Sequence, residues 1–432
     1  MNKTHFFRIS KKVFPFFILF FILSSSINSY AQHSTSSPYS RFGIGDISSR
    51  GNSQTYGLGG VSAAVRSSFS LNSVNPASYT GLLANTFLLD LGINYKSSAF
   101  VVDGQNQYNN DANISHFAFA FSAKNWLYFS AGIKPTSYVG YNIEHTYTLA
   151  DQTESLVSYS GQGGINKVYM GTAVHLFKRL SIGLNVNYNF GTLQKTSSAY
   201  LPTDGGSTVV DATESNVFKK FTPDFGIQYT DSIFGESVFT LGVVYNQQAK
   251  YNTYTELLTK RFLSINGNSY NDTIQHVETP EGTITIPASF GVGFAVNFKN
   301  KFLIAADYYQ QDWTNAGIEN IGDFSLTKEY TASAGLEFIP KLGGNKLHQN
   351  IRYRVGGYFK NSYLQANDQN INVLALTVGI GFPFKGNSNI LNMAFELGKR
   401  GTQENSLLQE NFALFSLSFS LHDYWFRKFK YN

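Results

Sequence analysis

Apolar and polar residues alternate along the chain with a period of two. In the clearest case, from Leu180 to Phe190, Leu, Ile, Val, Tyr and Phe at even positions are separated by Ser, Gly and Asn. A β-strand with this pattern has one apolar face and one polar face. Taken alone, the segment is also compatible with a soluble β-sandwich, whose apolar strand faces point inward.

Similar segments recur through the chain, and their lengths favour a membrane barrel over a soluble sandwich. Strands of soluble proteins average about five or six residues, whereas tilted strands that cross a bilayer need roughly 9–11. Most of the predicted strands are longer than the soluble average, and they lie at 86–96, 114–123, 126–134, 165–177, 179–190, 221–230, 237–248, 286–298, 301–312, 329–339, 350–360, 371–382, 388–399 and 410–421.

The connections between these strands alternate between long and short as far as residue 328. Long connections such as 135–164 and 249–285 are followed by short ones such as 178 and 299–300. Outer-membrane barrels have an even number of strands, short periplasmic turns and longer extracellular loops. The sequence therefore predicts an all-β protein, a transmembrane antiparallel barrel of about 14 strands spanning 86–421. It would lie among the lipids of the outer membrane, with both termini in the periplasm.

Residues 1–31 have the features of a secretory signal peptide. Four Lys and Arg residues precede an apolar stretch from Val13 to Leu23, and Ser29-Tyr30-Ala31 fits a cleavage site before Gln32. The alternative is a membrane anchor, but so short an apolar stretch cannot cross a hydrocarbon core of roughly 30 Å. We therefore expect the mature chain to begin at Gln32.

Charge and composition agree with an exported barrel. The formal net charge of +5 includes the four cations of the signal peptide, which leaves 29 Lys and Arg against 28 Asp and Glu. A nearly neutral chain gives no reason to expect nucleic acid as a partner. The chain has no cysteine, which excludes disulfides, thiolate metal sites and a lipid-modified cysteine.

The sequence contains no constellation that would support catalysis. It has no G-x-S-x-G, H-E-x-x-H or P-loop motif, and its eight histidines are scattered without metal-ligand spacing. We therefore expect a protein that is not an enzyme, with no catalytic residues, no metal site and no cofactor.

Residues 32–85, between the signal peptide and the first strand, are rich in Ser, Gly and Asn. Small residues with scattered apolar ones, as in Gly57–Val65, suit a plug inside a barrel. The alternative is a disordered leader. The rigid turn at Asn75-Pro76-Ala77 argues against disorder, and the sequence favours a plug.

A Gly-rich segment followed by Asn75-Pro76-Ala77, just ahead of fourteen strands, resembles the FadL family of outer-membrane transport proteins. The segments 37–43 (SPYSRFG), 397–402 (LGKRGT) and 425–431 (WFRKFKY) resemble the version of that family found in Bacteroidetes. The resemblance covers essentially the whole mature chain. It implies an N-terminal hatch that closes the lumen, with Asn75, Pro76 and Ala77 as its motif, and passage of hydrophobic molecules.

In the family, ligand leaves through a lateral gap at a kinked third strand. Here the third predicted strand ends at Gly132-Ile133-Lys134-Pro135, and proline cannot donate to a sheet ladder. Gly132 and Pro135 are therefore candidates for the kink. The simpler interpretation, which the sequence favours, is that the strand ends there.

Strand parity directs several charged side chains into the lumen. If Tyr353 and Val355 face lipid, then Arg352 and Arg354 face inward. The same reasoning places Glu337, Glu396 and Arg400 inside. The two arginines could receive the carboxylate of an amphipathic ligand, because guanidinium groups bind carboxylates in a bidentate manner. The sequence favours the other interpretation, in which they pair with Glu337 and the hatch.

Two functions follow from these expectations. The favoured one is passive uptake of small hydrophobic molecules through a hatch-gated lumen. The alternative is a barrel that does not transport, and serves instead as a subunit of a larger outer-membrane secretion or barrel-assembly complex. Its partners would be other outer-membrane proteins or lipoproteins. The long polar connections and the predicted periplasmic tail, residues 422–432, favour this alternative.

Overall fold

The computed structural model describes residues 35–48, 51–102, 104–149, 151–203, 206–233, 235–265, 268–317, 324–384, 389–404 and 407–424, without the side chains of 280 and 281. The predicted signal peptide and residues 425–432 of the predicted tail lie outside these ranges.

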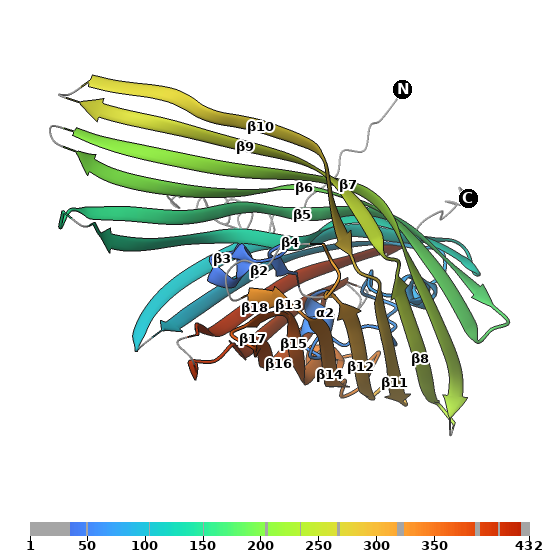
Figure 1. The fold of residues 1–432 in the computed structure, drawn as a ribbon. Coiled ribbons are helices and arrows are strands. Elements are labelled where there is room, and N and C mark those ends of the chain that lie inside the picture. Colours follow the sequence, from blue (N-terminus) through green and yellow to red (C-terminus); the bar gives the residue numbers. More distant parts are fainter. Residues whose placement is uncertain are drawn as a thin grey trace, which may run out of the picture. The chain divides into compact units, whose positions relative to one another are not determined.

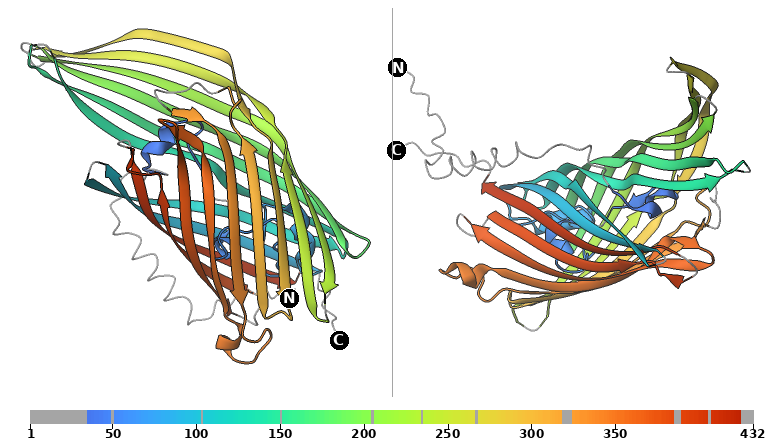
Figure 2. Two further views of the ribbon diagram at one scale, coloured as in Figure 1. Left: turned by 60° about the horizontal axis from the view of Figure 1, so that its bottom comes forward. Right: turned by 90° about the vertical axis from the view of Figure 1, so that its left-hand side faces the viewer.

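Fourteen antiparallel strands close into a barrel (Figures 1 and 2). Each of the fourteen predicted segments overlaps one of them, and the last strand pairs with the first, which confirms the predicted strand number and closure. The strands are β2 (Thr86–Val102), β3 (Gln105–Lys124), β4 (Leu127–Thr148), β5 (Glu154–Leu176), β6 (Leu180–Thr203), β7 (Gly206–Ile233), β8 (Ser237–Asn246), β11 (Ser289–Phe298), β12 (Phe302–Asp312), β14 (Lys328–Phe338), β15 (Arg352–Ala366), β16 (Gln369–Phe384), β17 (Asn389–Arg400) and β18 (Gln409–Tyr424).

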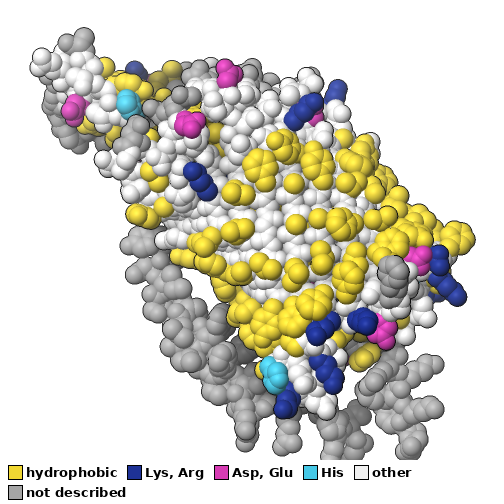
Figure 3. All heavy atoms as spheres, turned by 90° about the horizontal axis from the view of Figure 1, so that it is seen from below, with side chains coloured by type: hydrophobic (Ala, Val, Ile, Leu, Met, Phe, Trp, Pro, Cys, Tyr) yellow, Lys and Arg dark blue, Asp and Glu magenta, His cyan; other side chains and the backbone are white. Residues whose placement is uncertain are grey.

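The alternating pattern separates the two faces of the wall as predicted. On β6, Ser181, Asn185 and Asn187 are fully buried in the barrel interior, whereas Ile182 and Val186 are 39% and 48% exposed on the outside. Figure 3 shows hydrophobic side chains gathered across the outer wall, with Lys, Arg, Asp and Glu toward its ends. An apolar outer band with a polar interior is the arrangement of a barrel that sits in lipid.

Beyond the barrel, the wall continues as a sheet that the sequence pattern did not predict. The connection predicted at 249–285 is a hairpin of two long strands, β9 (Ala249–Ile265) and β10 (Asn268–Ile286). The lower part of β7 pairs with β8, and its upper part pairs with β9. Together, β4, β5, β6, β7, β9 and β10 form a six-stranded extension (Figure 1).

The predicted long connections 97–113, 135–164 and 191–220 are likewise mostly strand. Above the apolar band both faces of a strand can meet water, so the alternation that marks a strand within the bilayer is lost. The sequence pattern therefore gave the membrane-spanning part of each strand and missed its continuation.

The remaining elements are short. Inside the barrel lie η1 (Pro38–Arg41), β1 (Asp46–Ile47), α2 (Ser53–Tyr56) and η2 (Pro76–Gly81), while β13 (Phe324–Leu326) and α3 (Leu347–Asn350) belong to connections. No helix of the described residues is long and apolar enough to cross a membrane.

Candidate functional site

The N-terminal segment, defined here as the described residues from Thr35 to Leu82, packs against the inner face of the barrel (Figure 2). Asn75 is fully buried, and its side chain accepts a hydrogen bond from the Ala77 N–H at 3.0 Å, which caps η2. Its amide group donates to the Ala63 carbonyl at 2.7 Å and, at 3.4 Å, to the carbonyl oxygens of Ile227 and Val243. Asn75 therefore ties the segment both to itself and to the neighbouring strands β7 and β8.

Glycines on the wall leave room for the Asn75-Pro76-Ala77 turn. A Cβ atom on Gly183 would collide with the backbone of Pro76 and Ala77, and one on Gly226 would collide with the Asn75 side chain. The turn is thus in direct contact with β6 and β7. Its position against the wall explains why the motif needs a compact, rigid sequence.

Charged side chains hold the first part of the segment. Asp46 of β1 pairs with Arg400 of β17 at 2.7 Å, and Arg400 lies 3.7 Å from Glu410 of β18. Lys96 of β2 also pairs with Glu410, at 2.5 Å. The Arg400 guanidinium stacks over the Tyr39 ring, 4.7 Å from its centre, and burial raises the pKa of Tyr39 to about 12. The cluster spans three strands and the N-terminal segment.

Strands β3 and β4 pair along only part of their length. Their hydrogen-bonded register runs from Lys124↔Leu127 to Phe117↔Ile133 and stops there. Beyond this point β3 continues along β2 and β4 continues along β5. We call this unpaired stretch the β3–β4 divergence.

The divergence coincides with the predicted kink, and the favoured interpretation that the strand ends at Pro135 is wrong. β4 continues to Thr148, and its register with β5 shifts between Pro135 and Ser137, which makes Thr136 a bulged residue. Such bulges bend a strand. Gly132 is the last glycine before this point, and a Cβ there would collide with Ala118 and Phe117 of β3. Close packing at Gly132 therefore directly precedes the loss of pairing.

The N-terminal segment occupies the divergence. Its two-residue strand β1 pairs with β4, with Asp46 opposite Tyr138 and Ile47 opposite Ser137. On the other side, the Ser36 N–H and hydroxyl donate to Asp111 of β3 at 3.2 and 2.7 Å. The segment thereby replaces the wall contact that the two strands do not make with each other.

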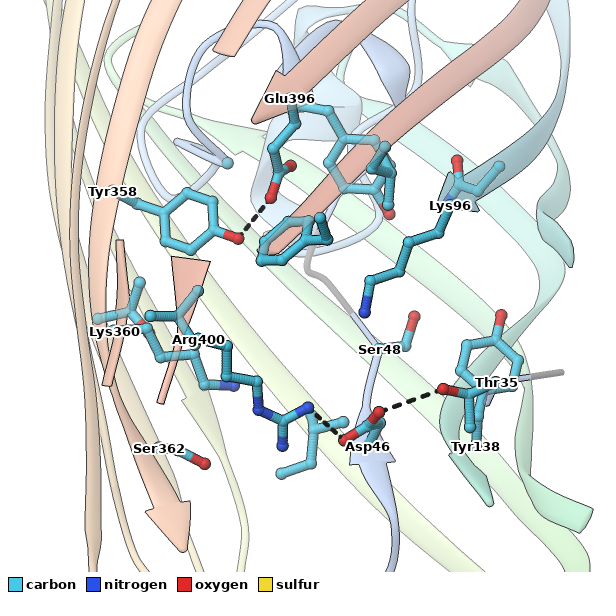
Figure 4. Close-up of a pocket in the computed structure, with 18 of the residues that line it drawn as sticks. Thr35, Asp46, Ser48, Lys96, Tyr138, Tyr358, Lys360, Ser362, Glu396 and Arg400 are labelled. Atoms are coloured by element: carbon cyan, nitrogen blue, oxygen red, sulfur yellow. Dashed lines mark hydrogen bonds and ion pairs between the residues drawn. The ribbon is translucent and has the colours of Figure 1, made fainter. Parts of the chain in front are cut away.

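Two cavities lie beside β1, and both are lined by Ile47 and Ser48. The first, of about 220 Å³, lies on the side of Lys96, Glu396 and Arg400 (Figure 4). The second, of about 160 Å³, reaches the divergence at Ser115 of β3 and at Pro135 and Thr136 of β4. β1 therefore stands between the lumen and the divergence.

Arg352, Arg354 and Glu337 point into the lumen, as strand parity predicted. The Arg354 Nε lies 2.6 Å from a Glu337 oxygen, and its Nη1 donates to Asn392 at 2.9 Å. The Arg352 guanidinium lies over the ring of Phe69 from the N-terminal segment, 5.1 Å from its centre. These contacts match the pairing that the sequence favoured. Neither arginine lines the two cavities, and a ligand role for them stays a prediction.

Sequence reasoning missed most of the cavity residues. Strand parity placed Glu396 and Arg400 inside, but Asp46, Lys96 and Tyr358 were not singled out. Parity alone could have found Lys96, which follows the outward-facing Ile93 and Tyr95. No local pattern marks Asp46, because its partner Arg400 is 354 residues away.

Residues 10–432 match the model of the family described as BamG. The chain belongs to the BamG family. No protein with a curated description matches its sequence. In the part of the chain that the structure describes, no group of three or more His, Cys, Asp or Glu side chains could hold a metal ion.

Solved structures of hydrocarbon channels are similar in fold to this BamG-family chain. The Pseudomonas putida toluene transporter TodX aligns with a TM-score of 0.58 and 13% identity over 89% of this chain and 100% of its own. The Ralstonia pickettii toluene transporter TbuX aligns at 0.54 and 16%, over 86% and 98%. A Pseudomonas aeruginosa FadL homologue aligns at 0.53 and 10%, over 87% and 99%. At these identities the likeness establishes the fold, which is that of FadL-type outer-membrane barrels.

Proposed function

We propose that the protein takes up small hydrophobic molecules passively across the outer membrane, with the N-terminal segment as a hatch and the β3–β4 divergence as the lateral exit. The observation that carries the proposal is that β1, rather than the barrel wall, fills the divergence, with a cavity on either side. Displacing β1 would connect the two cavities without breaking a wall strand.

The contacts of β1 suit a movable element. Asp46 and Ile47 pair with β4, and the Ser48 N–H donates to the Thr136 carbonyl at 2.9 Å, so β1 contributes few backbone hydrogen bonds, each worth about 1 kcal/mol net. The remaining restraint at Asp46 is electrostatic, from Arg400, together with a hydrogen bond from Thr35 at 3.2 Å. A few local contacts therefore keep the proposed exit closed.

The residues that line the larger cavity limit the chemical class of the molecule that the barrel would take up. The larger cavity combines aromatic rings, among them Tyr56, Tyr138 and Phe412, with the charged side chains of Lys96 and Glu396. Lys96 already pairs with Glu410, but a pure hydrocarbon would leave the Glu396 carboxylate without a charged partner, and buried charges without partners are unfavourable. We therefore favour molecules that join an apolar body to a polar group.

Deleting Thr136 tests the uptake proposal. The deletion removes the extra residue of the bulge, which would let β4 run straight and pair further with β3. We expect slower uptake of a radiolabelled small hydrophobic probe by cells expressing the variant than by cells expressing the native protein at equal surface abundance. Uptake that does not differ between the native protein, the variant and cells lacking the protein would refute the proposal.

The six-stranded extension favours a second function, as a barrel subunit of a larger outer-membrane complex. The outermost strand, β10, pairs with β9 on one side, and no described strand pairs with its other edge along residues 268–281. A long open edge of this kind offers backbone groups to an added strand from another protein. Its apolar side chains Tyr270, Ile274 and Val277 are 59%, 54% and 42% exposed.

The hairpin can be removed to test this second function. β8 pairs directly with β11, so the barrel closes without β9 and β10. Residues 253–282 can be replaced by an Asn-Gly turn, because Asn252 and Thr283 are cross-strand partners. We expect the native protein to leave the membrane in mild detergent as a stable complex of defined stoichiometry, and the shortened protein as a monomer. A native protein that is itself monomeric would exclude this function.

A further inference from the structure

The larger lumen cavity carries more carboxylates than cations. Its charged lining consists of the carboxylates Asp46, Asp111, Glu329 and Glu396 and the cations Lys96, Lys360 and Arg400. A further buried carboxylate, Glu410, pairs with two of these cations. Within the described residues, this cluster therefore has five carboxylates against three cations.

Among the described residues, two carboxylates of this cluster, Asp111 and Glu396, form no ion pair with Lys or Arg, and Asp111 already accepts two hydrogen bonds from Ser36 of the N-terminal segment. The Glu396 side chain is 4% exposed and accepts a hydrogen bond from the Tyr358 hydroxyl at 2.6 Å. No Lys or Arg of the described residues forms an ion pair with it. The nearby cations form ion pairs with other carboxylates: Lys96 pairs with Glu410, and Lys360 pairs with Glu329 at 3.3 Å.

Figure 4 shows how these side chains lie. Glu396 and Tyr358 form one end of the cavity, and the amino group of Lys96 points away from them, toward Ser48. Glu396 and Lys96 lie in one cross-strand row with Leu414 between them. The space at Glu396 is thus left to a molecule from outside.

The rings around Glu396 suit an organic cation. Tyr56, Tyr358 and Phe412 line the same cavity, and aromatic faces attract ammonium groups. Burial raises the pKa of Tyr56 to about 12, so its ring stays uncharged near neutral pH. A buried carboxylate with no counter-ion is unfavourable, and a cation that brings its own positive charge removes that penalty.

A metal ion fits this site poorly. Ca²⁺ takes six to eight oxygen ligands and Mg²⁺ demands an octahedral shell. No group of three acidic or His side chains that could hold a metal occurs among the residues that the structure describes. A single carboxylate flanked by aromatic rings suits an ammonium group attached to an apolar body.

We propose that this cavity binds a small hydrophobic amine in its ammonium form, with the charge at Glu396 and the apolar body against Tyr56, Tyr358 and Phe412. The volume of about 220 Å³ limits the ligand to a small molecule, below the 300–1,000 Å³ typical of drug-sized sites. Whether the amine is also carried across the membrane rests on the proposed uptake function, whereas its binding does not.

Calorimetry on the purified full-length protein in detergent tests the proposal. Benzylammonium and benzyl alcohol have nearly the same shape and differ in charge at neutral pH. We expect saturable binding of benzylammonium and at least tenfold weaker binding of benzyl alcohol. Equal binding of the two probes, no saturable binding of benzylammonium, or its full displacement by an equal concentration of sodium would overturn the proposal.

Three variants locate the site. Glu396→Gln keeps an acceptor for Tyr358 and removes the charge, so benzylammonium should bind at least tenfold more weakly. Glu144→Gln removes an exposed carboxylate of the extension and should bind within twofold of the native protein. Leu414→Phe reduces the cavity volume without changing any charge, so it should weaken binding even if Glu396→Gln fails to fold.

Unchanged affinity in both Glu396→Gln and Leu414→Phe would place the ligand elsewhere and refute the assignment. Binding that follows these expectations in a protein that shows no uptake would refute the uptake function and leave the amine site standing.

Discussion

Replacing Arg400 by glutamine removes the cation that holds β1 to the barrel wall. Arg400 and Asp46 are 11% and 15% exposed in their side chains and lie 2.7 Å apart. Removing one partner of a buried ion pair costs about 3–5 kcal/mol, because the other charge is left buried and alone. Glu410 keeps Lys96 as a partner, so only Asp46 loses its counter-ion and the lower value, about 3 kcal/mol, applies.

This cost falls on the closed position of the N-terminal segment. If β1 leaves the wall, Asp46 regains water, so the substitution favours the displaced state. A change of 1.4 kcal/mol is about tenfold in an equilibrium constant, so about 3 kcal/mol corresponds to at least a hundredfold rise in the displaced population.

Cysteine labelling measures this population, because the chain has no cysteine of its own. In an Ile47→Cys background, a membrane-impermeant maleimide reacts with the single thiol when β1 is displaced. We expect Arg400→Gln to raise the labelling rate at least a hundredfold. Arg261→Gln is the matched control, because the Arg261–Asp272 pair is about half exposed and such pairs contribute about 0–1 kcal/mol.

Labelling of the Arg400→Gln variant within twofold of the Ile47→Cys parent would refute the reasoning. So would an equal increase in the Arg261→Gln control, since that result would assign the effect to net charge rather than to the contact with Asp46.

Three further predictions concern the packing of the N-terminal segment. Asn75→Ala leaves the Ala77 N–H without its partner, while the Ala63 carbonyl keeps its hydrogen bond from Gln228, so it should lower the free energy of unfolding by about 1–3 kcal/mol, measured by denaturant titration in detergent; an unchanged midpoint would contradict the role given to this residue. Gly226→Val places side-chain atoms against Asn75 and should cost about 1–3 kcal/mol in the same assay; an unchanged midpoint would contradict this close contact. Because burial raises the pKa of Tyr56 from 10.0 to about 12, the folded state keeps this proton at a pH where the unfolded state loses it. This contribution to the free energy of unfolding, about 3 kcal/mol, is fully present below pH 10 and is lost as the pH rises from 10 to 12. A plot of the free energy of unfolding against pH should therefore fall less steeply in this range for Tyr56→Phe; identical slopes would exclude the contribution of Tyr56.

The sequence was most informative within the bilayer. On β6 and β16 one face must meet lipid and the other the lumen, so a period of two is imposed on the residues themselves. Leu374, Leu376 and Val378 of β16 are 62%, 71% and 52% exposed on the outer wall, as their alternation requires. This constraint is local, and it can therefore be read from one segment at a time.

Outside the bilayer the constraint disappears. The upper part of β7, from Gly206 to Phe218, has water-accessible residues on both faces, and its sequence carries no regular alternation. Its strand conformation is stabilised by pairing with β6 and β9, which no local pattern encodes. For the same reason the β9–β10 hairpin was predicted as a loop.

In the candidate site, too, the contacts within one segment could be predicted from the sequence, whereas the contacts between distant segments could not. The Asn75-Pro76-Ala77 turn was predicted because its cap is local, from Asn75 to Ala77 two residues later. The contact of Asp46 with Arg400 and the absence of a cation at Glu396 depend on which strands meet in the closed barrel. Strand parity can place a charge inside the lumen, and it led to Glu337 as the partner of Arg354 on the adjacent strand. It cannot name a partner from an element far away in the sequence.

A disulfide between β1 and β4 tests the central claim, that β1 closes the lateral exit. Ile47 and Ser137 are opposite each other in an antiparallel pair, where Cα atoms lie about 4.5–5.5 Å apart. This separation suits a disulfide. As a control, Phe119→Cys with Ala131→Cys joins β3 to β4 below the divergence, where the two strands already pair.

The measurement is uptake of a small hydrophobic probe by cells carrying Ile47→Cys with Ser137→Cys, before and after reduction. We predict uptake at the level of cells lacking the protein while the disulfide is intact, full recovery on reduction, and no effect of the control disulfide. Equal uptake in the oxidised and reduced states, with the disulfide shown to have formed, would contradict the account.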